Sequence, residues 1–476
     1  MTILGLEIST TSLKAMLFDE VHGATRIVSK PYAHLPGQYG SCDADAVLAQ
    51  ILKMGKSVCE ETRVDCVVLS CTWHSLLLCD AQFRPAGPMY LWCSSMAAAY
   101  CHEKRRDLDA VRRRYARTGA LGNPCYPYYK LGRLRELGTD LSDKYIGGNG
   151  SYFNYRMASR FAESLSMISG TGLFDLHERC FADDLLQELG LTRSQMPEIL
   201  PPGTVLALNG QTAQALGVLP GTPFVPAMPD GALDQIGAGA MAPAAMTFSV
   251  GTSASFRFHS SEAKISPDLS TWCYLAPDGS WLSGIGTSGS CNCVDWVKRM
   301  LFSPETSYVQ IEQGLPEDVR SAPFFLPFIF GERGPGWDDG HLGSFQELHA
   351  GHSRYDLYYA VLEGTLFNIM QCYERIRAMN GPAAKTCLSG GILNSPRWLR
   401  MCLDFFQMPM HEIREKHSSL LGGILLGAQL TDLQALARYE ARKPEDPILL
   451  PEGRAEVLWE RYARYLEYYR KLKLED

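Results

Sequence analysis

The stretch GLEISTTSLKAMLFDE, residues 5–20, decides the fold of this chain. Two apolar segments, ILGL and LKAMLF, flank a polar centre of one acid and several hydroxyls, which predicts two strands joined by a Ser/Thr-rich turn. The stretch AMTFSVGTSASFRF, at 245–258, repeats the plan of strand, small-residue turn and strand. One such hairpin near the start of each half favours a duplicated α/β domain whose two turns face each other across a cleft.

Both turns have the composition of a phosphate site. Small residues let backbone N–H groups approach a phosphate closely, and hydroxyl groups add further donors. Either turn alone has a simpler explanation, because many strand turns are rich in Ser and Gly for steric reasons. Their matching positions favour a phosphate held between two lobes.

Composition indicates a globular protein of two or three domains. The chain has 476 residues, 46% of them hydrophobic and 20% charged, which exceeds one ordinary core. A net charge of −7 without a long basic run argues against nucleic-acid binding. The sequence predicts neither a membrane span nor a signal peptide. Fifteen scattered cysteines indicate reduced thiols in a cytoplasmic protein, and no metal-type spacing of Cys or His occurs.

Apolar periodicity places the helices. It predicts one long helix at 355–379, and SSLLGGILLGAQL, at 418–430, is a small-residue helix suited to close packing. The segment 150–205 is expected to be rich in loops, with a short helix near 182–190. Further helices are expected at about 43–62, 96–117, 124–137 and 453–472.

Eight stretches, in order along the chain, resemble the FGGY carbohydrate kinases, a branch of the actin/hexokinase-like superfamily. GERGPGW and SGG…SPRWL are most similar to the gluconate and xylulose kinases. The resemblance implies two ribonuclease-H-like α/β domains around a central cleft, with residues 1–240 on the sugar side and 241–476 on the nucleotide side. The stretches are GLEISTTSLKAMLFD (5–19), LSCTWHSLLLCD (69–80), ISGTGLFDL (168–176), PDGALDQIGAG (229–239), FSVGTSASFR (248–257), GIGTSGSCNCVDW (284–296), LPFIFGERGPGW (326–337) and LSGGILNSPRWLRM (388–401).

Asp230 is the residue that the resemblance marks as the general base. It follows the apolar strand TPFVPAM at a turn beside Gly231, where a carboxylate can project into a cleft. The matching family residue takes a proton from the sugar hydroxyl as that hydroxyl attacks the γ-phosphate. The plainer alternative is an Asp that caps the following helix. Asp234, one turn on, is expected to be an acid on the helix face.

The resemblance also implies residues for ATP and Mg²⁺. Glu7 matches a carboxylate of the magnesium site, acting directly or through water, although a strand-end acid without a role is the alternative. The glycine pair at 390–391 and the helix start after it match the adenosine-contacting segment, with a plain strand-to-helix turn as the alternative. The residues matched to ATP and its phosphates are Thr10, Thr11, Ser12, Gly251, Thr252, Gly289, Asn292, Gly390, Gly391 and Ser395.

Trp73 and His74 follow the strand CVVLS, and ligands of open α/β sheets lie beyond the carboxyl ends of strands. In the family this position faces the sugar. The imidazole can hydrogen-bond a polyol hydroxyl, and the indole can cover an apolar sugar face. A structural histidine is the alternative for His74.

The sequence departs from the family pattern at four positions. Glu7 and Ser9 stand where the family has Asp and Gly, and Ser94 and Met96 replace the Asp and Arg of a W-x-D-x-R motif. These changes argue for an unusual substrate, weaker activity or lost turnover.

The first reading is therefore an ATP-dependent kinase for a sugar, polyol or sugar acid, as a dimer or a monomer. A non-catalytic nucleotide- or sugar-binding regulator, or another ATPase of the superfamily, is the alternative. A sugar acid calls for a basic residue in the pocket, and the candidates by position are Arg156, Arg160 and Arg333.

Overall fold

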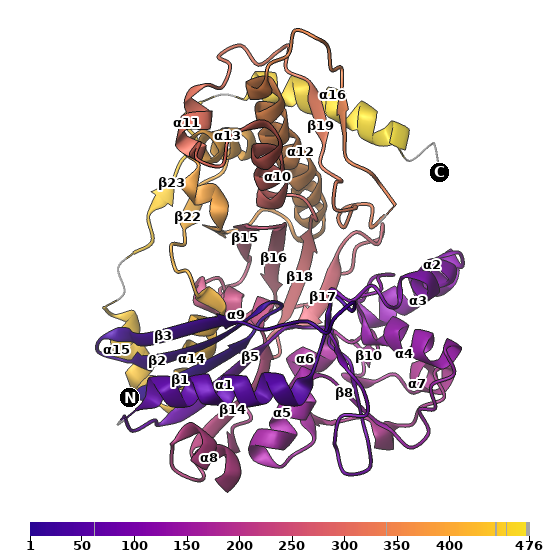
Figure 1. Ribbon diagram of the computed structural model, residues 1–476, viewed down its shortest axis with the longest axis vertical. Coiled ribbons are helices and arrows are strands. Elements are labelled where there is room, and N and C mark those ends of the chain that lie inside the picture. The colour runs from indigo at the N-terminus through magenta and orange to yellow at the C-terminus, as the bar shows by residue number, and fades with distance from the viewer. Residues whose placement is uncertain (61, 339, 443–444, 454, 473–476) are drawn as a thin grey trace.

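The computed structural model describes residues 1–60, 62–338, 340–442, 445–453 and 455–472. It has two lobes, each built on one mixed sheet, with the N-terminal lobe at the bottom of Figure 1 and most of the second half above it. The sheet of the first lobe runs β13-β14-β5-β1-β2-β3, with β1 at Thr2–Ile8, β2 at Ser12–Asp19, β3 at Gly23–Pro31, β5 at Cys66–Cys71, β13 at Leu206–Ala207 and β14 at Pro223–Pro229.

The second sheet repeats the plan of the first. In each sheet the first hairpin strand, β1 or β15, pairs antiparallel with its partner and parallel with a strand that returns after a helical crossover. This repeated order confirms the duplicated α/β fold predicted from the two hairpins. The second sheet runs β17-β18-β16-β15-β21-β22-β23, with β15 at Ala245–Val250, β16 at Ala254–Ser260, β17 at Trp272–Leu275, β18 at Trp281–Gly286, β21 at Lys385–Ser389, β22 at Met410–Glu412 and β23 at Ile448–Leu449.

Helices cover both faces of the first sheet. Successive side chains of a strand point to opposite faces, so Leu4 of β1 joins the core beneath α1 (Ala44–Cys59), whereas Ile3 packs with α14 (Ser418–Thr431). Helix α14 comes from the second half of the chain, yet it lies beside the N-terminal sheet (Figure 1). The N-terminal lobe is therefore completed by a late segment.

Helix α14 crosses α9 (Asp230–Gly237) at very short range. A Cβ atom at Gly422 would lie 1.8 Å from the Leu233 carbonyl oxygen, and one at Gly237 would lie 1.9 Å from the Ser418 carbonyl oxygen. Only glycine permits this approach, as the small-residue composition of 418–430 predicted. The crossing brings the first turn of α14 next to the strand end that carries Asp230.

Two helical expectations were wrong in detail. The helix expected at 96–117 is divided, because the Asp107 carboxylate accepts the Ala110 N–H and starts a new helix. The segment expected to be loop-rich contains α5 (Asn149–Ala158), which is held by tertiary contacts: the Asn154 amide bonds the Ala162 carbonyl and the Ala227 N–H. Its Gly, Ser and Asn content hides it from propensity arguments.

The other expected helices are present, including the long one, which is α12 (Arg354–Asn380). No helix in the described part of the chain is long and apolar enough to span a membrane, and none of the fifteen cysteines, all of them in that part, forms a disulfide. The remaining helices are α2 (Ala98–Arg105), α3 (Leu108–Thr118), α4 (Pro127–Glu136), α6 (Leu165–Ser169), α7 (Asp183–Glu188), α8 (Gly210–Leu216), α10 (Cys291–Leu301), α11 (Tyr308–Gln313), α13 (Pro396–Phe406), α15 (Leu433–Glu440) and α16 (Glu456–Leu472). Short strands are β4 (Ser41–Cys42), β6 (Leu77–Cys79), β7 (Met89–Tyr90), β8 (Tyr145–Gly147), β9 (Ala162–Ser164), β10 (Phe174–Asp175), β11 (Cys180–Phe181), β12 (Glu198–Leu200), β19 (Phe324–Leu326) and β20 (Ser344–Gln346).

Candidate active site

A cavity of about 230 Å³ lies between the lobes, beyond the carboxyl ends of β1, β5 and β14. Both hairpin turns contribute to it, since Thr10 follows β1 and Ser253 follows β15. The two turns therefore face one cavity, as their matching positions predicted. Its walls are Thr10, Thr72, Trp73, His74, Trp92, Asp230 and Gly231 from the first half, and Ser253, Ser255, Arg257, Trp272, Tyr274, Ile285, Gly286 and Arg333 from the second.

Asp230 projects into this cavity from the first residue of α9. Its carboxylate accepts the Gly231 N–H over 2.7 Å, while the N-cap position of the helix is Pro229. Burial and then the nearby charge of Glu7 raise the pKa of Asp230 to about 7, against the opposing effect of Arg257. A carboxyl group that titrates near neutral pH suits general-base work, because it is available as a base yet holds a proton well.

Arg257 reaches Asp230 from the other lobe. It stands on β16, and its Nη1 lies 3.0 Å from Oδ2 of Asp234, one turn along α9. A Cβ atom at Gly231 would lie 3.1 Å from the Arg257 Nε and 2.7 Å from the Trp73 ring, so only glycine leaves room for both side chains. Asp234, expected to be an acid on the helix face, instead holds a cavity-lining arginine.

Glu7 lies behind Asp230, at the end of β1, and is 1% exposed. One of its carboxylate oxygens pairs with Lys14 of β2, and the other accepts the Ser419 hydroxyl. The neighbouring hydroxyl, that of Ser418, donates to Asp234. The first two residues of α14 therefore fix the positions of the two acids near Asp230. These contacts join segments more than 180 residues apart, so no local sequence pattern predicts them.

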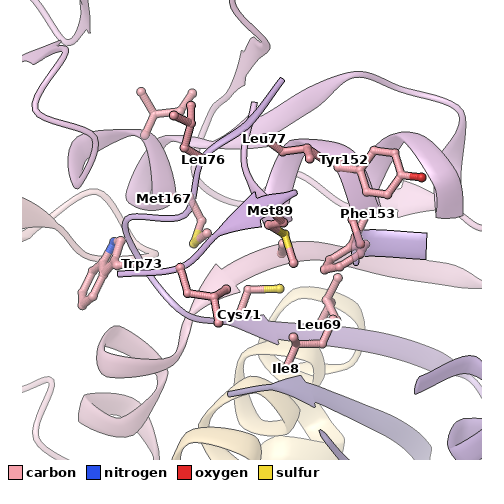
Figure 2. Close-up of a cluster of buried hydrophobic side chains, with 14 of the residues drawn as sticks. Ile8, Leu69, Cys71, Trp73, Leu76, Leu77, Met89, Tyr152, Phe153 and Met167 are labelled. Carbon is pink, nitrogen blue, oxygen red and sulfur yellow. The ribbon is translucent and has the colours of Figure 1, made fainter. Parts of the chain in front are cut away.

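Trp73 and His74 line one wall of the cavity, just after the strand CVVLS; that this wall faces the sugar stays a prediction. Figure 2 shows the Trp73 ring at the margin of a cluster of buried side chains. The cluster includes Cys71, the last residue of β5. The indole N–H donates to the Ser166 carbonyl over 3.0 Å, and the ring lies 5.2 Å from that of Tyr274. The wall is thus aromatic and held from behind.

His74 presents a neutral imidazole. Burial lowers its pKa to about 3, and its Nδ1 lies 2.5 Å from the Gly170 carbonyl oxygen. A carbonyl only accepts, so Nδ1 carries the ring hydrogen and Nε2 is left as an acceptor. Such an acceptor suits a polyol hydroxyl group.

Arg333 is a cation at the part of the cavity lined by Trp73, His74 and Trp92, which we call the sugar end after the ligand expected there. Within the described ranges it has no carboxylate partner, and its guanidinium lies 5.6 Å from the Trp92 ring and 5.8 Å from the Trp337 ring. The other two arginines proposed for an acidic substrate lie elsewhere: Arg156 pairs with Asp45 beside α1, and Arg160 pairs with Glu198. Those two expectations were wrong, because sequence position does not give the lobe-to-lobe geometry.

Trp92 joins the sugar end to the first hairpin turn. Its indole N–H donates to the Thr10 hydroxyl oxygen over 2.8 Å. Since that oxygen accepts from Trp92, the hydroxyl hydrogen is free to point at a ligand oxygen. Ser9, where the family has glycine, keeps an ordinary negative φ, so it does not distort the turn. Ser12 bonds Ser9, and Thr11 is exposed.

The residues predicted for the nucleotide gather around the second hairpin turn. The Cys291 N–H donates to the Gly251 carbonyl over 3.0 Å, and the Asn292 N–H donates to the Thr252 carbonyl over 3.2 Å. Gly390 has a φ of 104°, and a Cβ atom there would lie 2.3 Å from the Val250 carbonyl oxygen. Gly390 therefore allows β21 to end against the second hairpin turn, and contact of the glycine pair with ATP stays a prediction.

Two further residues of the nucleotide prediction lie close by. A Cβ atom at Gly391 would lie 2.8 Å from the Cys291 sulfur, and one at Gly289 would lie 2.4 Å from the Pro327 carbonyl oxygen. Both glycines thus allow backbone segments to approach the start of α10. Their contacts with ATP stay a prediction.

Ser395 differs from the expectation. It occupies the N-cap position of α13, but its hydroxyl donates to Glu312 of α11 and accepts no N–H from its own helix. Glu312 also accepts the Arg397 N–H over 3.1 Å. The N-terminus of α13 is thus capped by a distant carboxylate, which the local sequence could not reveal.

Comparison with known proteins agrees with this arrangement. The N-terminal domain of the FGGY family of carbohydrate kinases matches residues 2–237, and its C-terminal domain matches residues 246–430. The chain belongs to the FGGY family of carbohydrate kinases. It is therefore a phosphotransferase that acts on an alcohol group, with ATP as the phosphoryl donor.

Individual FGGY relatives span most of this chain. A gluconokinase of Bacillus subtilis (strain 168) is 25% identical over 451 residues, covering 90% of this chain and 87% of the relative. A xylulose kinase of Escherichia coli (strain K12) is 27% identical over 339 residues, covering 70% and 68%. A ligand-bound xylulose kinase structure from Lactobacillus acidophilus has a TM-score of 0.90 at 24% identity, covering 100% of this chain and 98% of that one.

The departures from the FGGY motif W-x-D-x-R lie outside the cavity wall. Ser94 is 5% exposed, and Met96 packs at the edge of the N-terminal core, whereas Trp92 of the same motif lines the cavity. The replaced positions therefore do not line the cavity. Arg257 and Trp92 are site residues that the sequence interpretation did not identify.

Proposed function

We propose that this FGGY kinase phosphorylates a hydroxyl group of a sugar acid, with Asp230 as the general base. The observation that carries the choice of substrate is Arg333, a cation in the cavity without a carboxylate partner among the described residues. A substrate carboxylate would supply that partner through charge-assisted hydrogen bonds. The similarity to the B. subtilis gluconokinase supports the same class.

The transfer follows from the position of Asp230. A substrate hydroxyl within hydrogen-bond reach of its carboxylate loses its proton to Asp230 as the hydroxyl oxygen attacks the γ-phosphorus of ATP. The new P–O bond forms while the bond between the γ-phosphorus and the β,γ-bridging oxygen breaks, and ADP leaves. His74 accepts a hydrogen bond from another substrate hydroxyl, and Thr10 and the second hairpin turn donate to phosphate oxygens.

Glu7 and its surroundings fit a Mg²⁺ site in which the protein supplies few of the ligands. No group of three His, Cys, Asp or Glu side chains in the described ranges could hold a metal, so the nucleotide phosphates would supply most ligands. Each oxygen of Glu7 already accepts one hydrogen bond and retains a lone pair, which suits contact with a metal-bound water. When bound, Mg²⁺ neutralises charge on the phosphates.

The test is an ADP-release assay with three substrates of one size class: D-gluconate, its neutral counterpart D-glucitol, and D-xylulose. The wild-type enzyme is compared with Arg333→Met and with Arg160→Met, whose arginine pairs with Glu198 away from the cavity. We expect gluconate to be preferred, and Arg333→Met to lose about tenfold or more in kcat/KM for gluconate alone.

Two outcomes would reject this proposal. A wild-type preference for xylulose over gluconate would favour the ketose class of the E. coli relative. An equal loss for gluconate and glucitol in Arg333→Met would show that the arginine supports the pocket without binding a carboxylate.

A further inference from the structure

Lys130 is a buried charge that the proposed reaction does not use. It lies on α4, its side chain is 0% exposed, and no carboxylate within the described ranges pairs with it. Lysine is almost never fully buried without a partner, because removing an ammonium from water is costly. A lysine kept in this position therefore requires an explanation from its surroundings.

Three backbone carbonyl groups surround the Lys130 ammonium. Its Nζ donates to the carbonyls of His74 over 2.6 Å, Leu91 over 2.8 Å and Cys125 over 2.7 Å. These three acceptors match the three donors of an ammonium group. They come from three separate segments, so one side chain ties together parts of the chain that are distant in sequence.

Each of the three segments carries a residue of the sugar end. His74 itself lines the cavity, and Leu91 precedes Trp92, which lines it too. Cys125 precedes Tyr126, whose hydroxyl lies 2.5 Å from the hydroxyl of the cavity residue Tyr274. The Lys130 ammonium thus sits directly behind the wall that faces the substrate.

The positive charge of Lys130 reaches the cavity. Together with Arg333 it lowers the pKa of His74, beyond the larger effect of burial. Burial lowers the pKa of Lys130 itself to about 7, and the thiols of Cys125 and Cys93 oppose this. An anion bound at the sugar end would compensate the buried charge in a medium of low dielectric constant.

We propose that Lys130 is a specificity-determining positioning residue: it holds the three segments of the sugar end and gives that end its preference for a negatively charged substrate. This inference rests on the proposed sugar-acid activity. Lys130 does not touch the substrate. It acts through the carbonyls it binds and through the field of its charge.

The test measures binding by calorimetry for gluconate and for glucitol, which differ by the carboxylate. Lys130→Gln keeps hydrogen-bond donors and removes the charge, and Lys53→Gln, on the exposed face of α1, is the matched control. In Lys130→Gln we expect the preference for gluconate over glucitol to fall about tenfold, with glucitol affinity nearly unchanged. A merely structural lysine would weaken both ligands equally, and that result would overturn the inference.

A second measurement leaves Lys130 in place, in case the variant does not fold. In the double variant Asp230→Asn, Glu163→Gln, which removes the two buried carboxyl groups whose pKa is raised to about 7, gluconate binding at pH 8 should draw a proton onto Lys130. The proton uptake is measured from the dependence of the binding heat on the buffer. Absence of uptake would overturn the inference.

Failure of the two proposals can be told apart. A wild-type enzyme that binds glucitol but not gluconate overturns both. A wild-type enzyme that prefers gluconate, with the same preference in Lys130→Gln, overturns only the role of Lys130.

Discussion

Replacing Asp230 by Asn should abolish turnover and at the same time stabilise the protein. The carboxyl group is held in a cavity where burial and the Glu7 charge raise its pKa from an ordinary 3.8 to about 7. Between these two pH values the folded state binds more protons than the unfolded state, so the free energy of unfolding falls as pH rises from about 4 to 7. Above pH 7 the full cost of ionising the buried carboxyl group lowers the free energy of unfolding. Asn cannot ionise, so the variant does not have this cost.

The size of this effect follows from the same values. The gap between 3.8 and about 7 corresponds to at most ~4 kcal/mol. Asp230 lines an open cavity, and water there screens its charge, so we reduce the expected gain to about 1–2 kcal/mol at pH 8. With an unfolding entropy of about 2.1 cal/mol/K per residue, a chain of 476 residues gains ~1–2 °C in Tm from this change. At pH 4–5 the variant and the wild type should unfold at nearly equal temperatures.

Thermal unfolding and steady-state kinetics from pH 5 to 8.5 provide the measurement. In the wild type, kcat/KM should fall about tenfold between pH 8 and pH 6, because roughly a tenth of Asp230 is ionised at pH 6. Asp230→Asn should lower turnover by a factor of ~10²–10⁴. Asp318→Asn, with a side chain 72% exposed, is the control for loss of one charge. Turnover in Asp230→Asn within about tenfold of the wild type, or an unchanged Tm at pH 8, would refute the reasoning.

Two other substitutions test the nucleotide side. Trp92→Phe keeps an aromatic ring beside Arg333 but removes the N–H that orients the Thr10 hydroxyl. We expect steady-state kinetics to show kcat reduced about fivefold with the sugar KM unchanged. A change confined to the sugar KM would contradict this. Gly390→Ala places a Cβ atom 2.3 Å from the Val250 carbonyl oxygen at a φ of 104°; calorimetry with a non-hydrolysable ATP analogue should show more than a ~10-fold loss of affinity. Gly381→Ala, with a φ of 83° and open space around the Cβ position, is its control, and equal losses in the two variants would count against the close approach.

The duplicated α/β domain could be predicted because each copy has its own local sequence pattern. Each hairpin carries its own alternation and its own Ser/Thr/Gly turn, and the strand order follows once both are placed. The resemblance to the FGGY family singled out Asp230 and the glycine pair at 390–391, and each directly follows an apolar strand, which places Asp230 at the cavity and the pair at the second hairpin turn. Residues that stand at strand ends are accessible to sequence reasoning.

The rest of the site depends on contacts between segments far apart in the sequence. Lys130 lies in an ordinary helical pattern, and its acceptors are backbone carbonyls that any residue could supply. Glu312 caps a helix that starts more than eighty residues later, and Ser419 reaches Glu7 across 412 residues. Such pairings leave no periodicity or spacing in the sequence.

The Arg257–Asp234 ion pair has a consequence for the base itself. Arg257 stands on the second sheet and Asp234 on the helix after the first, so the pair joins the lobes beside Asp230. Arg257 already lowers the pKa of Asp230, against the larger effect of burial. Without Asp234 the Arg257 guanidinium could pair with Asp230. The Asp230 carboxylate would then stay ionised, but the ion pair would occupy it. Asp234 therefore keeps Arg257 close enough to lower the pKa of Asp230. Because Arg257 is paired with Asp234, the Asp230 carboxylate stays accessible to the substrate hydroxyl.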